Sequence, residues 1–217
     1  DYDVATDARP EQVRALFGHR KTLAVGESFG VVIVLGPRVD GLHIKIEGAT
    51  FRAEGSYPDG RRPDPNEIRY TTPEEDAQRR DFTINAIALR LDGENFGELF
   101  DPLNGQKDLN DKLIRVLHAK SFVDDPTRIF RAVRYAVRYG FEIAPETLNL
   151  VNDEARGVLV GLSGERLRHE FDLMFEEENA SAMLERVKEL DFLNVIHPAL
   201  LSANSQQLTA RVDKPEQ

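Results

Sequence analysis

The sequence predicts an α/β domain with a small mixed sheet, followed by an all-helical domain. Up to about residue 117, short apolar runs alternate with polar residues and are separated by glycine and proline, a pattern typical of strands. From Ser121 onward, apolar residues recur with a period near 3.6, which is typical of helices. The pattern changes at 118–121, so we expect domains at 1–117 and 118–200 and a frayed polar tail at 201–217.

Composition excludes several classes of site. The 217 residues include no cysteine, which excludes disulfides, thiolate zinc sites and cysteine nucleophiles, and the five histidines show no metal-ligand spacing. No run approaches 18 apolar residues and no signal peptide is visible, so we expect no membrane span and a cytoplasmic location. The net charge of −10 argues against nucleic-acid binding, although local basic patches can override the total.

The first domain contains short elements bounded by turn signals. Turns are expected at Gly36-Pro37, Asp40-Gly41 and Asp92-Gly93. The stretch 52–66 is rich in glycine and proline and is expected to be a long loop. The other expected elements are strands at 1–6, 23–25, 30–35 and 42–51, helices at 10–17, 74–80 and 105–113, a hairpin across 82–91 and 96–100, and an extended run at 114–117.

Four helices are expected in the second domain. The first begins at Asp124-Asp125-Pro126, an acidic cap followed by proline, and ends before Gly140. Ser163 is the expected N-cap of a helix at 164–177. The remaining two are expected at 145–156 and 180–190.

Carboxylates gather in the predicted strands of the first domain. Asp1 and Asp3 are two residues apart, so on a strand both point to one face. Their repulsion is relieved either by a raised pKa or by a divalent cation such as Mg²⁺, which prefers oxygen ligands. Glu47 alternates with Ile44 and Ile46 and is a candidate third carboxylate, brought close by strand pairing. The alternatives are a solvated turn and an ordinary exposed glutamate.

Charged residues also cluster in the first helix of the second domain. Arg128, Arg131 and Arg134 are three residues apart and therefore share a neighbourhood on the helix. Asp125 and Arg128 lie near its N-terminus, one turn apart. Surface salt bridges are the alternative role for these arginines.

Six motifs in order resemble one family, the class II tRNA nucleotidyltransferases (CCA-adding enzymes) and the related bacterial poly(A) polymerases. The resemblance covers roughly residues 1–200 and implies a polymerase β-like nucleotidyltransferase head with a small mixed sheet, followed by an all-helical neck and body. The motifs are Asp1-Tyr2-Asp3-Val4-Ala5-Thr6, Glu47-Gly48-Ala49-Thr50-Phe51-Arg52, Arg79-Arg80-Asp81-Phe82-Thr83-Ile84-Asn85-Ala86, Asp101-Pro102 with Gly105 and Asp108-Leu109, Asp124-Asp125-Pro126-Thr127-Arg128 continuing through Arg131 and Arg134, and Gly164-Glu165-Arg166-Leu167.

The resemblance implies roles for individual residues. Asp1 and Asp3 would bind two Mg²⁺ ions, and Glu47 would complete the catalytic carboxylates by metal contact or by orienting the attacking hydroxyl. Asp125 and Arg128 would select the incoming base in place of a template. The implied substrates are CTP, ATP and the tRNA 3′ end. The implied nucleotide-binding residues are Arg80, Asn85, Asp125, Arg128, Arg131 and Arg134.

Some alternatives remain open within the family. The stretch 25–30 favours CCA addition over poly(A) synthesis, and 52–66 resembles the loop that switches full CCA-adding enzymes from C to A. An A-only enzyme, a poly(A) polymerase and an inactive nucleotide- or RNA-binding fragment are the alternatives. The family's glycine-rich segment with an Arg-Asp pair normally precedes the first motif, and the tRNA-binding body follows the last. We expect that segment to be trimmed or supplied by another chain, and the 217 residues alone to be inactive.

Overall fold

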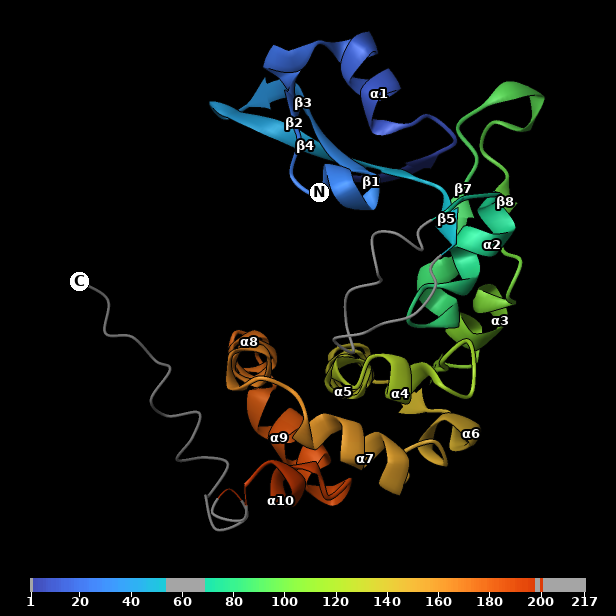
Figure 1. Cartoon of the computed structure of the whole chain (residues 1–217). Coiled ribbons are helices and arrows are strands. Elements are labelled where there is room, and N and C mark those ends of the chain that lie inside the picture. The colour runs from blue at the N-terminus through green and yellow to red at the C-terminus, as the bar shows by residue number, and fades with distance from the viewer. Residues whose placement is uncertain (1, 54–68, 198–199, 201–217) are drawn as a thin grey trace. The chain divides into compact units, whose positions relative to one another are not determined.

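The computed structural model describes residues 2–53, 69–197 and 200, and these form two compact units (Figure 1). The units divide between Arg80 and Asp81, ahead of the change in periodicity at 118–121. The division into functional domains at residue 118 stays a prediction. Most of the expected loop at 52–66 and all of the expected tail at 201–217 lie outside the described residues.

The first unit is built on a four-stranded mixed sheet, as expected. Its strands are ordered β1-β4-β3-β2, with β1 parallel to β4 and the other pairs antiparallel. Val32 and Val34 are buried on one face, and α1 contacts β3 and β4. The bounds are β1 Tyr2–Thr6, α1 Pro10–Phe17, η1 His19–Lys21, β2 Thr22–Leu23, η2 Glu27–Phe29, β3 Val31–Val39 and β4 Leu42–Thr50.

Two turn predictions for this sheet had different outcomes. Asp40 and Gly41 both have positive φ, of 52° and 82°, and they connect β3 to β4 as expected. The turn expected at Gly36-Pro37 is wrong, because β3 continues through these residues to Val39. The strand register shifts between Leu35 and Arg38 instead, which accommodates a proline that has no backbone N–H to donate.

A short helix after the undescribed segment completes the first unit. Helix α2 (Pro73–Gln78) begins at Thr72, whose side chain accepts from the Glu75 backbone N–H. Strands β5 (Arg52–Ala53) and β6 (Arg69–Tyr70) pair antiparallel beside it.

The second unit begins with short elements that belong to the helical core. Phe82 and Ile114 are fully buried in the same cluster as Phe130 and Met183, so residues 81–117 pack with the helices that follow. The expected hairpin is present as β7 paired antiparallel with β8. The bounds are η3 Thr83–Ala86, β7 Ala88–Leu89, η4 Gly93–Asn95, β8 Leu99–Phe100, α3 Gly105–Asn110 and β9 Leu113–Ile114.

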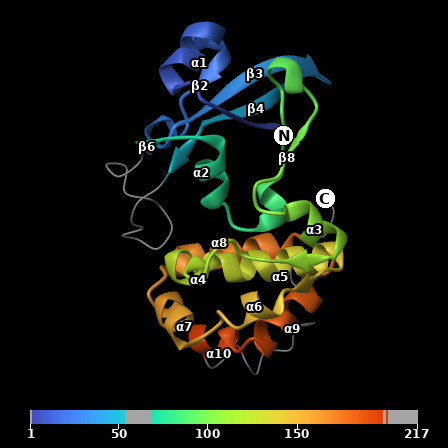
Figure 2. The ribbon, with the colours of Figure 1, turned by 90° about the vertical axis from the view of Figure 1, so that its right-hand side faces the viewer.

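The helical part places α5 and α8 in one layer, with α7, α9 and α10 in the next (Figure 2). Helix α5 runs to Tyr139 and ends at Gly140, which has a φ of 63°, as expected. Among the described residues, no helix is long and apolar enough to span a membrane. The bounds are α4 Ser121–Asp124, α5 Thr127–Tyr139, β10 Glu142–Ile143, α6 Pro145–Leu148, α7 Asp153–Val160, α8 Gly164–Phe175, α9 Ala180–Glu189 and α10 Phe192–Ile196.

The single helix expected at 145–156 is wrong. It is divided into α6 and α7 because Asn152 adopts an extended conformation and its side chain accepts from the Ala155 backbone N–H at 3.0 Å, starting a new helix. Between the two helices, Leu150 and Val151 pack against the core.

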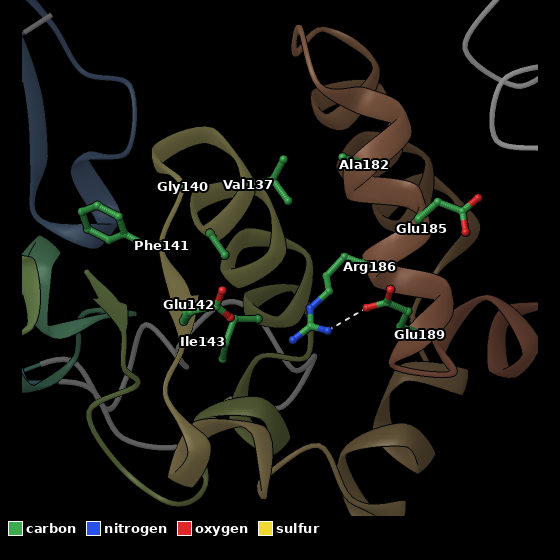
Figure 3. Close-up of a pocket in the computed structure, with 10 residues that line it drawn as sticks. Val137, Gly140, Phe141, Glu142, Ile143, Ala182, Glu185, Arg186 and Glu189 are labelled. Carbon is green, nitrogen blue, oxygen red and sulfur yellow. Dashed lines mark hydrogen bonds and ion pairs between the residues drawn. The ribbon is translucent and has the colours of Figure 1, made fainter. Parts of the chain in front are cut away.

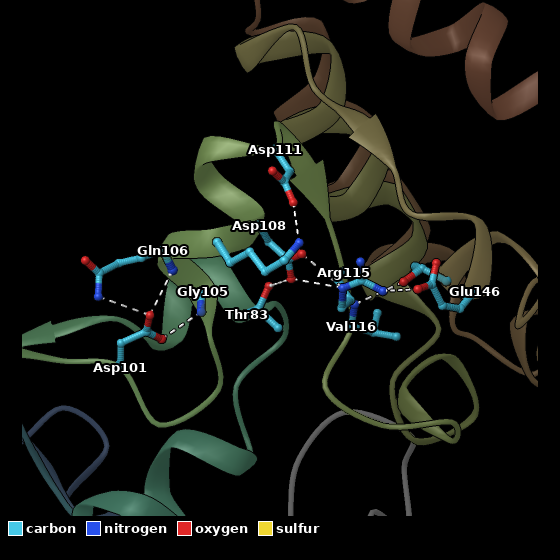
Figure 4. A network of polar contacts seen from close by, with 11 residues as sticks. Thr83, Asp101, Gly105, Gln106, Asp108, Asp111, Arg115, Val116 and Glu146 are labelled. Carbon is cyan, nitrogen blue, oxygen red and sulfur yellow. Dashed lines mark hydrogen bonds and ion pairs between the residues drawn. The ribbon is translucent and has the colours of Figure 1, made fainter.

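A polar network fixes α3 against η3 (Figure 4). The Asp101 carboxylate accepts from the backbone N–H groups of Gly105 and Gln106 at 2.7 and 2.9 Å. Burial opposes ionisation of Asp101, but these backbone donors outweigh it and lower the pKa of the carboxyl. The buried Asp108 accepts from the Thr83 hydroxyl at 2.7 Å, so the start and the middle of α3 are both held.

We predict that Gly105→Ala destabilises the protein. An added Cβ would overlap the Thr83 carbonyl oxygen and lie 2.8 Å from Ile87 Cγ1. Since the overlap is with backbone, the loss should be roughly 1–3 kcal/mol, measured by chemical denaturation. The matched control is Gly157→Ala in α7, where no atom lies within 4 Å of the added Cβ and a gain of about 1 kcal/mol is expected. Equal stability of wild type and Gly105→Ala would contradict the packing described.

Candidate functional site

Two carboxylates lie side by side on the sheet of the first unit. Asp3 on β1 and Glu47 on β4 are partners in the parallel register, so their side chains leave the sheet on the same face, from strands about 4.8 Å apart. Both are exposed. The prediction that strand pairing brings Glu47 beside Asp3 is therefore confirmed, whereas Asp1 lies outside the described residues.

The carboxylate pair fits a hard divalent cation in donor type, because Mg²⁺ prefers carboxylate oxygens. Over residues 2–53, 69–197 and 200, no group of three or more His, Asp or Glu side chains lies close enough together to form a metal site. The metal-binding roles of Asp1 and Asp3 stay predictions.

Arg80 lies just after α2 and contacts a buried acid of that helix. Its Nη2 is 3.4 Å from Asp76 Oδ2, and Arg79 Nε donates to Asp76 Oδ1 at 2.9 Å. Asp76 is only 2% exposed and also accepts from the Arg52 backbone N–H at 3.1 Å. Asp76 is not among the residues that the sequence predicts for the site, although its spacing of three and four residues from the two arginines is a signal for such contacts.

Asp81 brings together two of the residues assigned to nucleotide binding. Its Oδ1 accepts from Asn85 Nδ2 at 2.9 Å, and its Oδ2 accepts from Arg131 Nε and Nη2 at 2.8 and 2.5 Å. Arg131 also donates to the Tyr135 hydroxyl at 3.1 Å. Burial lowers the pKa of Arg131, but the attraction to Asp81 and Tyr135 outweighs it and keeps the pKa raised. Asp81 and Tyr135 were missed as partners, because nothing in the spacing links residues 81 and 131.

Asp125 and Arg128 lie at the start of α5, one turn apart as expected. Asp125 Oδ1 accepts from the Thr127 backbone N–H and hydroxyl at 3.0 and 2.6 Å, and it lies 3.4 Å from Arg166 Nη2. Arg128 is 7% exposed, and its Nη1 donates to Ser121 Oγ at 2.9 Å. Both side chains that would select the base are thus held by neighbouring protein groups.

Arg134 forms a buried ion pair with Glu170 of α8. The two side chains are 3.4 Å apart, and each residue is 5% exposed. Burial raises the pKa of Glu170, against the attraction of Arg134, and burial lowers the pKa of Arg134. Because the folded protein then binds the Glu170 proton more tightly than the unfolded chain does, this carboxyl lowers the stability of the fold as the pH rises from about 4.5 through the raised pKa, and the loss is constant above that pKa.

One cavity in the second unit contains none of the expected site residues. It has a volume of about 510 Å³ and lies between α9 and the end of α5 with β10 (Figure 3). Val137 and Ile143 line it together with acidic side chains, and Arg186 pairs with Glu189 at 2.7 Å on its α9 side. The cavity is therefore separate from the cluster at Asp81 and Asp125.

Comparison with known proteins identifies the class. The family described as "Poly A polymerase head domain" matches residues 1–115, and "Probable RNA and SrmB- binding site of polymerase A" matches residues 140–204. The crystal structure of the Bacillus stearothermophilus CCA-adding enzyme in complex with CTP aligns with a TM-score of 0.75 and 30% identity, over 97% of this chain and 48% of that one. The fold is therefore a polymerase β-like nucleotidyltransferase head followed by helices.

Sequence identity to curated relatives shows the family to which the chain belongs. It is 39% identical to an A-adding tRNA nucleotidyltransferase of Geobacter sulfurreducens, over 86% of this chain and 21% of the relative. It is 38% identical to the CCA-adding enzyme of Bacillus subtilis, over 81% of this chain and 42% of the relative. The chain belongs to the family of class II tRNA nucleotidyltransferases and bacterial poly(A) polymerases, and it spans less than half the length of these two relatives.

We predict that Arg134→Met and Glu170→Met each destabilise the protein by about 3–5 kcal/mol, because each leaves a buried charge without its partner. The double variant should recover most of this loss, since the two methionines replace the pair with apolar packing. Urea denaturation measures all four proteins. If the stable double variant also binds CTP and ATP as wild type does, the assignment of Arg134 to nucleotide binding is wrong.

Proposed function

We propose that the protein to which this chain belongs adds CMP and AMP to the 3′ end of tRNA without a nucleic-acid template. The observation that carries this proposal is the pairing of Asp3 with Glu47 on one face of the sheet, in a head of this family. Relatives of comparable identity are named as tRNA nucleotidyltransferases. The tRNA 3′ end, CTP and ATP are the proposed partners, and a cytoplasmic location stays a prediction.

The carboxylates serve nucleotidyl transfer by holding and orienting the reacting groups. The tRNA 3′-hydroxyl attacks the α-phosphorus of the nucleotide in line, a new phosphodiester bond forms, and pyrophosphate leaves. Magnesium ions held by Asp3 and, from the motif match, by Asp1 would supply charge neutralisation. Glu47 lies beside Asp3 and either completes this ligand set or orients the hydroxyl. Positioning supplies most of the rate, so no covalent enzyme intermediate is required.

Selection of the base rests on two side chains at the start of α5. The Asp125 carboxylate offers acceptors and the Arg128 guanidinium offers a planar set of donors, which together can imitate a Watson–Crick edge. Their spacing of three residues directs both to one base. In this assignment C and A are accepted, whereas U and G are rejected.

Addition of A alone is the second candidate. The chain is 39% identical to an A-adding relative and 38% identical to a CCA-adding one, so identity does not separate the two products. Poly(A) synthesis on general RNA is the third candidate in the family, and an inactive nucleotide-binding fragment is the candidate from another class.

Primer extension by the full-length protein separates these candidates. We predict stepwise addition of C, C and A to a tRNA that lacks its 3′ end, and none to generic RNA. Addition of A only to tRNA ending in CC would identify an A-adding enzyme, and long A tracts on generic RNA would identify a poly(A) polymerase. The control is the variant Asp3→Asn with Glu47→Gln, which should lose about 10²-fold or more in rate if these carboxylates are catalytic. Nucleotide binding without incorporation would contradict the proposal.

We predict that Asp125→Ala with Arg128→Ala relaxes base choice more than it lowers total turnover, because the binding of triphosphate and primer is retained. The measurement is the ratio of incorporation of UMP and GMP to that of CMP and AMP. Glu11→Gln, an exposed acid in α1, is the surface control. Equal losses for all four nucleotides would exclude the selecting role.

A further inference from the structure

The two oxygens of the Asp125 carboxylate have different surroundings. Oδ1 faces three donors, namely the backbone N–H and the hydroxyl of Thr127 and the guanidinium of Arg166. Within the part of the chain that the structure describes, no donor reaches Oδ2. Oδ1 is thus held by the protein, and Oδ2 is the oxygen left to meet a base.

Arg166 and Thr127 contact Asp125 from different helices. Thr127 belongs to α5 itself, whereas Arg166 lies in the first turn of α8, where the Ser163 side chain accepts from the Arg166 backbone N–H at 3.4 Å. The Arg166–Asp125 contact therefore ties the start of one helix to the start of another. The side chains of Arg166 and Asp125 are only 16% and 15% exposed, so solvent screens this ion pair less than a surface pair.

Holding one oxygen matters because the carboxylate torsion of aspartate is broad and nearly two-fold. A carboxylate that rotates freely presents its acceptors in many directions, whereas discrimination between bases requires an acceptor fixed to within about 10–20°. Arg128 is held in a comparable way by Ser121 of α4. The start of α5 is thus supported from both adjoining helices, α4 and α8.

We propose that Arg166 is a specificity-determining positioning residue, which fixes Asp125 so that Oδ2 faces the base of the incoming nucleotide. This inference rests on the proposed function. Arg166 acts through Asp125 and not on the nucleotide. Its removal should therefore change which nucleotide is added, and should change the rate of adding the correct one much less.

The test compares substitutions at two arginines of the same helix. Arg166→Met removes the ion pair, Arg166→Lys restores the charge without the planar fork, and Arg168→Met is the matched control, because Arg168 is 81% exposed and pairs with Asp172 of its own helix. The measurement is kcat/KM for CTP, ATP, UTP and GTP in primer extension by the full-length protein. Arg166→Met should lower discrimination against UTP and GTP by about tenfold, within the usual range of coupling between neighbouring residues. Arg166→Lys should restore part of it, and Arg168→Met should change nothing.

A double variant distinguishes positioning from direct contact. With Asp125→Ala already present, Arg166→Met should cause no further loss of discrimination, since the group that it positions is gone. An equal fall in kcat/KM for all four nucleotides, persisting beside Asp125→Ala, would show that Arg166 contacts the nucleotide and would overturn the proposal. Thermal unfolding of each variant shows whether a loss of discrimination is caused by misfolding. If Arg166→Met does not fold, the discrimination of Arg166→Lys, which keeps the charge, tests the positioning role instead.

The outcome also separates this inference from the proposed function. If Asp125→Ala leaves discrimination intact, the selecting role of Asp125 is wrong and the role of Arg166 is wrong with it. If Asp125→Ala relaxes discrimination and Arg166→Met does not, only the positioning role is overturned.

Discussion

The second unit depends on the neutralisation of the charges carried by α5. The helix buries Ile129, Phe130 and Val133 on its apolar face, and Arg128 and Arg134 are buried with them, whereas the side chain of Arg131 is 34% exposed. A buried charge without a partner costs several kcal/mol, and each arginine of the series is met by a group from elsewhere in the chain. Arg131 pairs with Asp81 and Arg134 pairs with Glu170, so these two ion pairs join α5 to the segment just before η3 and to α8.

These pairings change how the arginine series can act on a nucleotide. Spacing alone suggests three equivalent cations that face one ligand. In the structure Arg134 is closed off by Glu170, and Arg131 shares its donors between Asp81 and Tyr135. A phosphate would have to compete with an existing carboxylate for either one. The internal partners thus favour a supporting role for both arginines, and in the proposed function base selection would fall to Asp125 and Arg128 at the start of the helix.

The sequence predicted local features better than distant pairings. Gly140 and Ser163 mark helix ends through backbone chemistry that acts within a few residues, and both were identified correctly. The pairing of Glu47 with Asp3 was also predictable, because strand alternation restricts which side chains share a face. The contact of Asp81 with Arg131 spans 50 residues and has no local signal. The break at Asn152 was missed because a side-chain cap there outweighs a continuous helical pattern.

The two groups of candidate residues, on the sheet and at the start of α5, are held in position by different kinds of contact. Asp3 and Glu47 are exposed and held by strand register alone, which suits ligands for an ion that brings its own charge and geometry. In the proposed function, Asp125 and Arg128 would instead distinguish bases that differ by single donors and acceptors, which requires that their orientation be fixed before the nucleotide arrives. Contacts from Thr127, Arg166 and Ser121 provide that orientation in the protein itself. In the proposed function, specificity without a template would therefore depend as much on the groups that hold Asp125 and Arg128 as on these two residues themselves.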